Sequence, residues 1–279
     1  MSRIRASKFS ILIMVLLALM LSSGWACLGL DASRSSTLLA HRTPLWFFNT
    51  TLTSDLDGDN KPDLVVGNMG LNTQFRPSEK EPVEIYYKDF DNNGSVEPIF
   101  SFYIQGKRYP YVTRDELVGQ LPVMRKRFSN FKSYADITME DLFKNNELKD
   151  AGHLVADHMG TTCFLSNSAG KYVVADLPKE SQYSPVYSII QMDFNGDGNT
   201  DLLLSGNNSH AKLRLGKFDA NYGVLLAGDG KGRFRYINQN ESGFNVWGDV
   251  RSCIQLKDKI YFGINGRKMV AYAQTKQKQ

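Results

Sequence analysis

The sequence predicts an all-β domain that begins near residue 45. From residue 43 onward, short apolar runs rich in Val, Ile, Tyr and Phe alternate with turns of Gly, Asn and Asp. Strands of antiparallel sheets have this length and composition. The turns at 167–170 and 228–232 supply the Asn and Gly residues that tight hairpins need. We therefore expect hairpins over residues 164–174 and 225–237.

Residues 1–26 have the pattern of an export signal. Basic residues precede the apolar run 11–21, and small residues lead to Ala26. The apolar run is too short to cross a bilayer as a helix, which takes about 20 residues. Cleavage after Ala26 would leave Cys27 first, and a lipid on Cys27, simple secretion and an uncleaved anchor all remain open. We expect a signal peptide (1–26), a linker (27–44) and an exported protein that is periplasmic, on the cell surface or extracellular.

The charge balance does not predict a nucleic-acid partner. The chain has 33 Lys and Arg residues against 29 Asp and Glu residues, but three of the basic residues lie in the leader. The basic cluster at 125–132 is expected to be a solvated helical face, paired with acids such as Asp136 and Glu140. The only membrane contact that the sequence predicts is through a lipid on Cys27.

Residues 113–152 interrupt the strand pattern. Thr113 with Glu116, and Thr138 with Asp141, have the spacing of a helix N-cap and the acid that completes a capping box. We expect a helical insertion here, with Pro122 ending its first helix.

Two cysteines, Cys163 and Cys253, lie in apolar runs. A disulfide between them and a pair of buried thiols are both left open, since export allows the first and apolar surroundings favour the second.

An acidic loop of constant spacing occurs three times, at residues 55–63 (the first loop), 89–97 (the second loop) and 193–201 (the third loop). Each loop has oxygen-bearing side chains at positions one, three, five and nine, and position seven would offer its backbone carbonyl. Calcium takes six to eight oxygen ligands, and without a cation the carboxylates would repel one another. We predict up to three Ca²⁺ sites, with the candidate ligands Asp55, Asp57, Asp59, Lys61 and Asp63; Asp89, Asp91, Asn93, Ser95 and Glu97; and Asp193, Asn195, Asp197, Asn199 and Asp201.

These loops are not EF-hands. The twelfth position, which holds a bidentate Glu in an EF-hand, is Val66, Phe100 or Leu204 here. Position six is Gly in the second and third loops and Asn60 in the first, where Asn tolerates a left-handed conformation better than most residues do.

Residues 55–67 and 193–206 resemble the calcium loop and following strand of FG-GAP/VCBS repeats, the units of integrin-alpha-like β-propellers. Residues 166–178 and 227–237 resemble the hairpin of the same repeats. The resemblance to the C-terminal part of large secreted bacterial repeat proteins runs from 45 to 273 and implies a β-propeller-like domain, followed by a polar tail (274–279). A blade takes about 40 to 45 residues, so about four to five blades are expected. Such a ring is either small or incomplete, and an incomplete ring needs a partner.

The sequence offers no clear catalytic set. The four histidines have no metal-ligand spacing, and neither a phosphate loop nor a nucleophile elbow is present. The leading prediction is therefore a non-catalytic, calcium-binding module for binding or assembly, with a protein or glycan ligand at the cell envelope. Two alternatives remain: a partner-dependent remnant of a longer repeat protein, and a polysaccharide-active enzyme that uses Asp115, Glu116 and Asp141.

Overall fold

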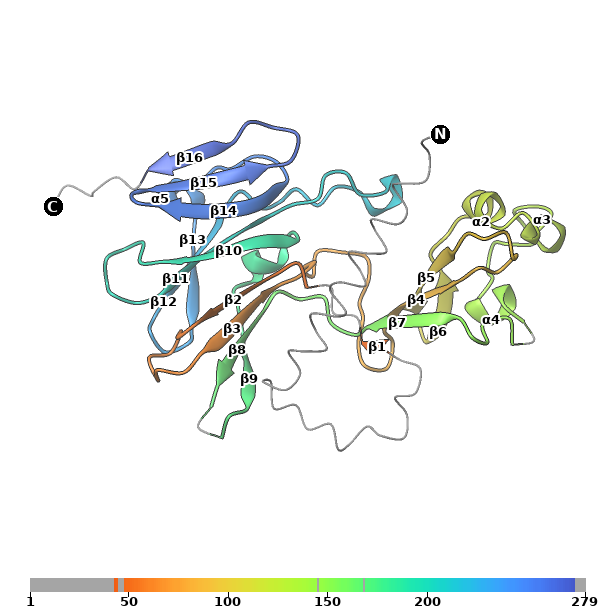
Figure 1. Ribbon diagram of the computed structural model, residues 1–279, viewed down its shortest axis with the longest axis horizontal. Helices are drawn as coiled ribbons and strands as arrows, with labels where there is room; N and C mark the ends of the chain where they lie inside the picture. The colour runs from red at the N-terminus through yellow and green to blue at the C-terminus, as the bar shows by residue number, and fades with distance from the viewer. Residues whose placement is uncertain (1–42, 45–47, 145, 168, 274–279) are drawn as a thin grey trace.

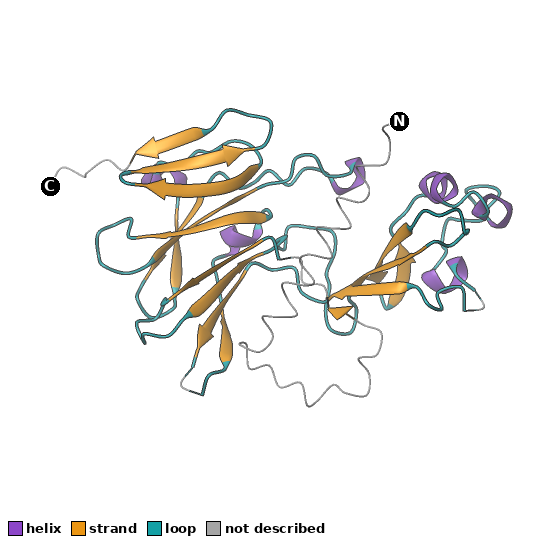
Figure 2. Ribbon diagram, in the orientation of Figure 1, coloured by secondary structure: helices purple, strands orange, loops and turns teal. Residues whose placement is uncertain are grey.

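The computed structural model describes residues 43–44, 48–144, 146–167 and 169–273. Strands dominate it, and they form four separate sheets (Figure 1, Figure 2). Neighbouring strands are antiparallel throughout these sheets except where Thr43–Pro44 pairs in parallel with Gly152–Ala156. This confirms the all-β, propeller-like class. The predicted signal peptide, the linker up to residue 42 and the polar tail lie outside the described residues.

Three of the sheets are successive blades, each with its strands in chain order. The first blade contains β2 (Thr50–Ser54), β3 (Asp63–Gly67), β8 (Thr162–Ser166) and β9 (Tyr172–Ala175). The second contains β10 (Val186–Met192), β11 (Asp201–Gly206), β12 (Val224–Gly228) and β13 (Phe234–Ile237). The third contains β14 (Val250–Leu256), β15 (Lys259–Ile264) and β16 (Val270–Ala273). Both predicted hairpins are confirmed, because β8 pairs with β9 and β12 with β13.

The blades pack face to face through two apolar cores. Val65 and Cys163 of the first blade pack against the face of the second that carries Leu202 and Leu204. The opposite face of the second blade, which includes Leu203, packs against the third blade. The second blade is therefore covered on both faces, whereas the first and third each contribute one face to these two cores. Both cysteines are free thiols, and burial raises the pKa of Cys163 to about 12.

The fourth sheet belongs to an inserted unit, residues 68–161, which separates β3 from its partner β8. The strands are β1 (Thr43–Pro44), which comes from before the first blade, β4 (Val83–Lys88), β5 (Glu97–Ile104), β6 (Lys107–Pro110) and β7 (Gly152–Ala156). Their order in the sheet is β1-β7-β4-β5-β6. The insertion in the first blade is therefore longer than the predicted helical segment 113–152. The sequence did not reveal its full length, because β4 and β5 have the same alternating composition as blade strands.

Three short helices cover one face of the inserted sheet: α2 (Arg114–Gln120), α3 (Met124–Arg127) and α4 (Met139–Leu142). Both predicted capping boxes are present, with Thr113 and Glu116 at α2 and Thr138 and Asp141 at α4. The helices bury an apolar core with the sheet, including Leu117, Met139 and Leu142. Three further short helices connect strands elsewhere: η2 (Lys179–Gln182), η3 (Leu213–Leu215) and α5 (Gln239–Ser242).

The basic cluster at 125–132 has a different ion-pair partner from the predicted one. Arg127 pairs with Glu147 at 2.8 Å, whereas Glu140 pairs with Arg108 of β6 at 2.6 Å. The prediction of Glu140 as a partner was wrong because α4 lies beside β6, so Glu140 reaches across to the sheet.

A buried polar network lies beneath these helices. The Glu84 side chain is fully buried on β4, where Arg108 Nη1 donates to its carboxylate at 2.8 Å. The same arginine donates to the hydroxyl of Tyr86, and the ring of His153 stacks on the Tyr86 ring with centroids 4.2 Å apart. Burial alone would raise the pKa of Glu84, but hydrogen bonds from His153 and Arg108 lower it overall. This network gives the inserted sheet a specific polar contact to its surface helix α4 through Glu140.

No helix within the described residues is long and apolar enough to cross a membrane.

Candidate metal-binding loops

The first loop joins β2 to β3 and curls around its own carboxylates. The backbone N–H groups of Gly58 and Asn60 donate to the two oxygens of Asp55 at 2.8 and 2.9 Å. Asp57 Oδ1 accepts from the N–H of Asp59 at 3.1 Å. Gly58 and Asn60, at positions four and six, are both left-handed, with φ of 81° and 62°. Asn60 therefore adopts the conformation that was predicted for it.

The other two loops repeat this backbone design. The position-one acids accept from backbone N–H groups in the same part of each loop: Asp89 from Asn93 and Gly94, and Asp193 from Gly196 and Gly198. Positions four and six are again left-handed, at Asn92 and Gly94 in the second loop and at Gly196 and Gly198 in the third. Because three stretches of different sequence adopt one conformation, they are one structural motif and not merely three acidic turns.

The carboxylate at position nine fastens the loop to its sheet. Asp63 is completely buried, and its two oxygens accept from the N–H groups of Leu56 and Ser166, each at 2.8 Å. Asp201 does the same with Phe194 and Gly228, each at 2.9 Å. Ser166 and Gly228 lie on the neighbouring strands β8 and β12. Position nine is therefore a link between the loop and the adjacent strand of the blade.

Replacing Asp63 by Ala is expected to destabilise the first blade strongly, because two buried N–H groups lose their acceptor at about 1–3 kcal/mol each. Urea denaturation in chelator measures this loss without any contribution from a bound cation. Asp63→Asn, which keeps one acceptor oxygen, is the matched control and should lose clearly less stability. A loss below about 0.5 kcal/mol for Asp63→Ala, the size of an ordinary surface substitution, would contradict the role assigned to this carboxylate.

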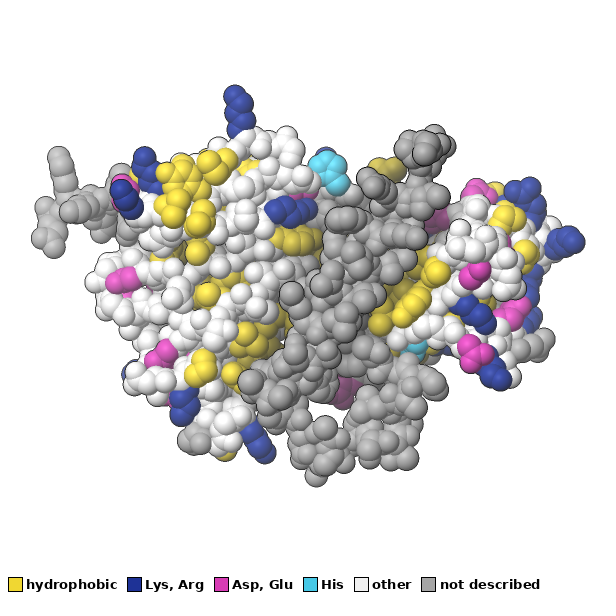
Figure 3. Space-filling view, viewed as in Figure 1, with side chains coloured by type: hydrophobic (Ala, Val, Ile, Leu, Met, Phe, Trp, Pro, Cys, Tyr) yellow, Lys and Arg dark blue, Asp and Glu magenta, His cyan; other side chains and the backbone are white. Residues whose placement is uncertain are grey.

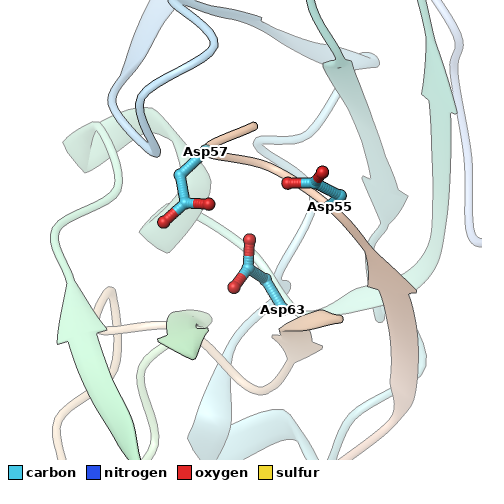
Figure 4. Close-up of side chains that lie close together, drawn as sticks. All are labelled: Asp55, Asp57 and Asp63. Carbon is cyan, nitrogen blue, oxygen red and sulfur yellow. The ribbon is translucent and has the colours of Figure 1, made fainter. Parts of the chain in front are cut away.

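Positions one, three and nine bring their carboxylates together in two of the loops. One oxygen from each of Asp55, Asp57 and Asp63 lies within 4.8 Å of the others (Figure 4). The second loop holds the same arrangement with Asp89, Asp91 and Glu97. One buried oxygen there, Asp91 Oδ1, has no hydrogen-bond partner. A cation within such a group would give these oxygens a common partner.

The position-five side chains lie differently. Asp59 turns to Lys61, whose Nζ is 2.7 Å from Asp59 Oδ2. Asn93 Oδ1 accepts from the N–H of Ser95 at 2.7 Å. In the third loop the amide nitrogen of Asn195 donates to Asp197 at 2.8 Å. The ligand roles of positions five and seven stay predictions.

The third loop differs from the first two in its oxygen group. Among the described residues, its acids do not form a cluster of the kind seen in the other two loops. The reason lies in its composition, since position three is Asn195, which offers an amide oxygen in place of a carboxylate. The third loop therefore brings one negative charge fewer to positions one, three and nine.

Burial and neighbouring charges shift the pKa values of three loop acids. Burial raises the pKa of Asp57, and the charges of Asp63, Asp59 and Asp55 raise it further. Burial also raises the pKa of Asp201, with Asp197 and Asp193 adding to the effect. The pKa of Asp59 is instead lowered by its hydrogen bond with Lys61. Negative charge is thus costly at Asp57 and Asp201, where a divalent cation would be stabilising.

The donor atoms fit a hard cation. Carboxylate and amide oxygens suit Ca²⁺ or Mg²⁺, whereas structural zinc sites use mainly thiolate and imidazole ligands. The side chains that would hold the ion at positions one, three and nine are Asp55, Asp57 and Asp63 in the first loop, Asp89, Asp91 and Glu97 in the second, and Asp193, Asn195 and Asp201 in the third.

The first and third loops share a structural neighbour, the turn between β12 and β13. The N–H of Gly232 in this turn donates to the carbonyl of Leu56 in the first loop at 3.0 Å. A Cβ on Gly230 would collide with the side chain of Asn199 in the third loop. The second loop lies apart from both, between β4 and β5 of the inserted unit. The three loops are therefore not three equivalent corners of one ring.

The acids of the enzyme alternative have structural partners. Glu116 closes the capping box of α2 and pairs with Arg214 at 2.9 Å. Asp115 pairs with Arg114 at 3.0 Å, and Asp141 caps α4. Each of these contacts explains an acid without reference to a substrate.

One polar cluster was missed by the sequence reasoning. Asp249 is 2% exposed and accepts from the N–H and the hydroxyl of Ser209, with His210 Nδ1 3.2 Å away. The cluster ties the loop after β11 to the start of the third blade. Its members are far apart in the sequence, so no local spacing indicated it.

Comparison with known proteins identifies the repeat. Residues 47–78 match the FG-GAP repeat family model, and this range spans β2, the first loop and β3. The chain therefore contains an FG-GAP repeat, as its motifs predicted. A search of curated proteins and a search of solved structures find no match to the chain.

Proposed function

We propose that this chain is a calcium-stabilised, non-catalytic repeat module that acts by binding or assembly at the cell envelope or outside the cell. The observation that carries the calcium assignment is the convergence of Asp55, Asp57 and Asp63 within the matched repeat. The leader sequence supports an exported location, where calcium modules bind with Kd values on the order of 10⁻⁴ to 10⁻³ M.

A non-catalytic role is supported by the contacts of the candidate acids. Asp115, Glu116 and Asp141 serve helix caps and ion pairs in the inserted unit. The match to the FG-GAP repeat model favours the same role. The partner class that we propose is a protein or glycan ligand.

Native mass spectrometry of the full chain tests the calcium assignment directly. The parent should hold up to three calcium ions, and Asp57→Ala, Asp91→Ala and Asp197→Ala should each hold one fewer than the parent. The reason is that each loop supplies its ligands from its own nine residues. Asp115→Ala, which removes an exposed acid outside the loops, is the matched control and should keep the parental count.

Two results would contradict the assignment. One is a parent that holds no calcium at millimolar concentration, and the other is an equal loss of calcium in the Asp115→Ala control. If a variant of the first or third loop lost the ions of both these loops while its melting curve stayed cooperative, the two loops would be coupled through the turn that they share.

A further inference from the structure

The outer face of the third blade is apolar and exposed. Ile254 and Leu256 on β14 are 53% and 54% exposed, and Ile254 is paired with Tyr261 on β15. The opposite face of the same strands, with Ile260 and Phe262, is buried against the second blade. Figure 3 shows apolar side chains gathered over this blade. Contiguous exposed apolar side chains, unlike single scattered ones, mark a surface that binds something.

The second blade shows what this face does when it is covered. Strand β10 pairs with β11 in the same way as β14 pairs with β15. In both pairs the register shifts after the first residue, which is Val186 in β10 and Val250 in β14. Counting from this irregularity, Ile190 and Met192 of the second blade correspond to Ile254 and Leu256. Ile190 and Met192 pack against the core shared with the third blade. The third blade therefore keeps apolar residues at the positions through which the second blade contacts its successor.

The opposite end of the chain offers the matching surface. Leu64, Phe164 and Val174 lie side by side across the first blade, on the face turned away from the second blade. Val174 is 62% exposed, and the other two are only partly buried. The corresponding residues of the second blade, Leu202 and Leu226, pack against the first blade. The outer face of the third blade and the open face of the first blade are therefore equivalent to the two surfaces that meet where consecutive blades pack within the chain.

We propose that the outer face of the third blade binds the open face of the first blade of a second copy of this chain. The two blades meet as the second and third blades meet within one chain, through apolar side chains on facing sheets. This proposal specifies the partner in the assembly role proposed above. Because the contact surface is separate from the calcium ligands, the calcium count and the association test can fail independently.

Light scattering on the full chain over a concentration series tests the proposal. The parent should show a mass above that of the 31.4 kDa single chain and approach it on dilution. Leu256→Lys on the third blade and Val174→Lys on the first should each raise the apparent dissociation constant about tenfold or more, since each buries a charge in an apolar contact. Phe131→Lys, at a 67% exposed residue of the inserted unit, is the control and should associate like the parent.

Mixing the two variants gives the sharpest result. Leu256→Lys keeps a normal first blade and Val174→Lys keeps a normal third blade. The mixture should therefore form a complex of one copy of each at a concentration where each variant alone stays a single chain. Three results would overturn the proposal: a parent that stays a single chain up to about 100 µM, far above typical protein–protein Kd values; a Leu256→Lys effect with no Val174→Lys effect; or a Phe131→Lys effect of the same size. Melting curves of the variants confirm that the folds are intact.

Discussion

Removing calcium is expected to lower the melting temperature of the full chain by roughly 5 to 10 °C for each loop that is occupied. A cation that binds only the folded state stabilises it by about 2.7 kcal/mol at 100 times its Kd. For a chain of this size, 1 kcal/mol corresponds to about 2–4 °C. The clustered carboxylates of the first and second loops make these two loops the main contributors. Differential scanning calorimetry in chelator and in millimolar calcium measures the shift.

Magnesium provides the control for this experiment. It is smaller than calcium, demands near-ideal octahedral geometry and keeps several of its waters. The same concentration of magnesium should therefore give a smaller shift than calcium. Equal melting temperatures in chelator and in saturating calcium would contradict the calcium assignment for every loop.

Replacing Glu84 by Ala is expected to destabilise the inserted unit by about 1–3 kcal/mol, because Arg108 loses its buried acceptor and keeps only Glu140 and the Tyr86 hydroxyl as partners. The Glu84 side chain is completely buried, and Arg108, which pairs with it, is 17% exposed. Hydrogen exchange of the backbone amides in β4 and β5 measures the loss within this unit. The double variant Glu84→Leu with Arg108→Met should recover much of the stability, because it removes both charges together.

The pH dependence separates charge from packing at this position. The pKa of Glu84 is lowered in the folded protein from an ordinary value of 4.5. The stability that its ionised form contributes is therefore complete above pH 4.5 and is lost as the pH falls through the lower, folded-state pKa. The stability gap between the parent and Glu84→Gln should narrow on acidification below 4.5. A gap that stays constant over this range, or a Glu84→Ala loss under about 1 kcal/mol, would show that the ion pair is not what stabilises the sheet.

The features that the sequence predicted well are those determined by neighbouring residues. The hairpins at 167–170 and 228–232 depend on local turn chemistry, and the capping boxes of α2 and α4 span four residues each. The conformation of the acidic loops also depends on their own residues, which is why Asn60 could be assigned a left-handed conformation from its position alone.

The features that the sequence did not predict depend on contacts between distant segments. Nothing local distinguishes β4 and β5, which form the inserted sheet, from the strands of a blade. The pairing of β3 with β8 and the contact of Asp249 with Ser209 join residues that lie far apart in the sequence, so no local motif indicates these contacts. For the same reason, the motif count of three loops did not reveal that the second loop lies in a different sheet from the others.

The insertion of residues 68–161 into the first blade also orders the events of folding. Strand β3 can pair with β8 only after this long segment has brought its two ends together, and each doubling of a loop costs about 0.6 kcal/mol in closure entropy. In the native protein the ends are joined by hydrogen bonds from Gly70 to Met159 and from Asn68 to Thr161, and Gln182 binds both ends. If the inserted unit folds first, it holds the ends of residues 68–161 together, so that β3 and β8 are already close before they pair. The slow step in completing the first blade is then the folding of the segment that interrupts it, whereas the second blade forms from consecutive hairpins.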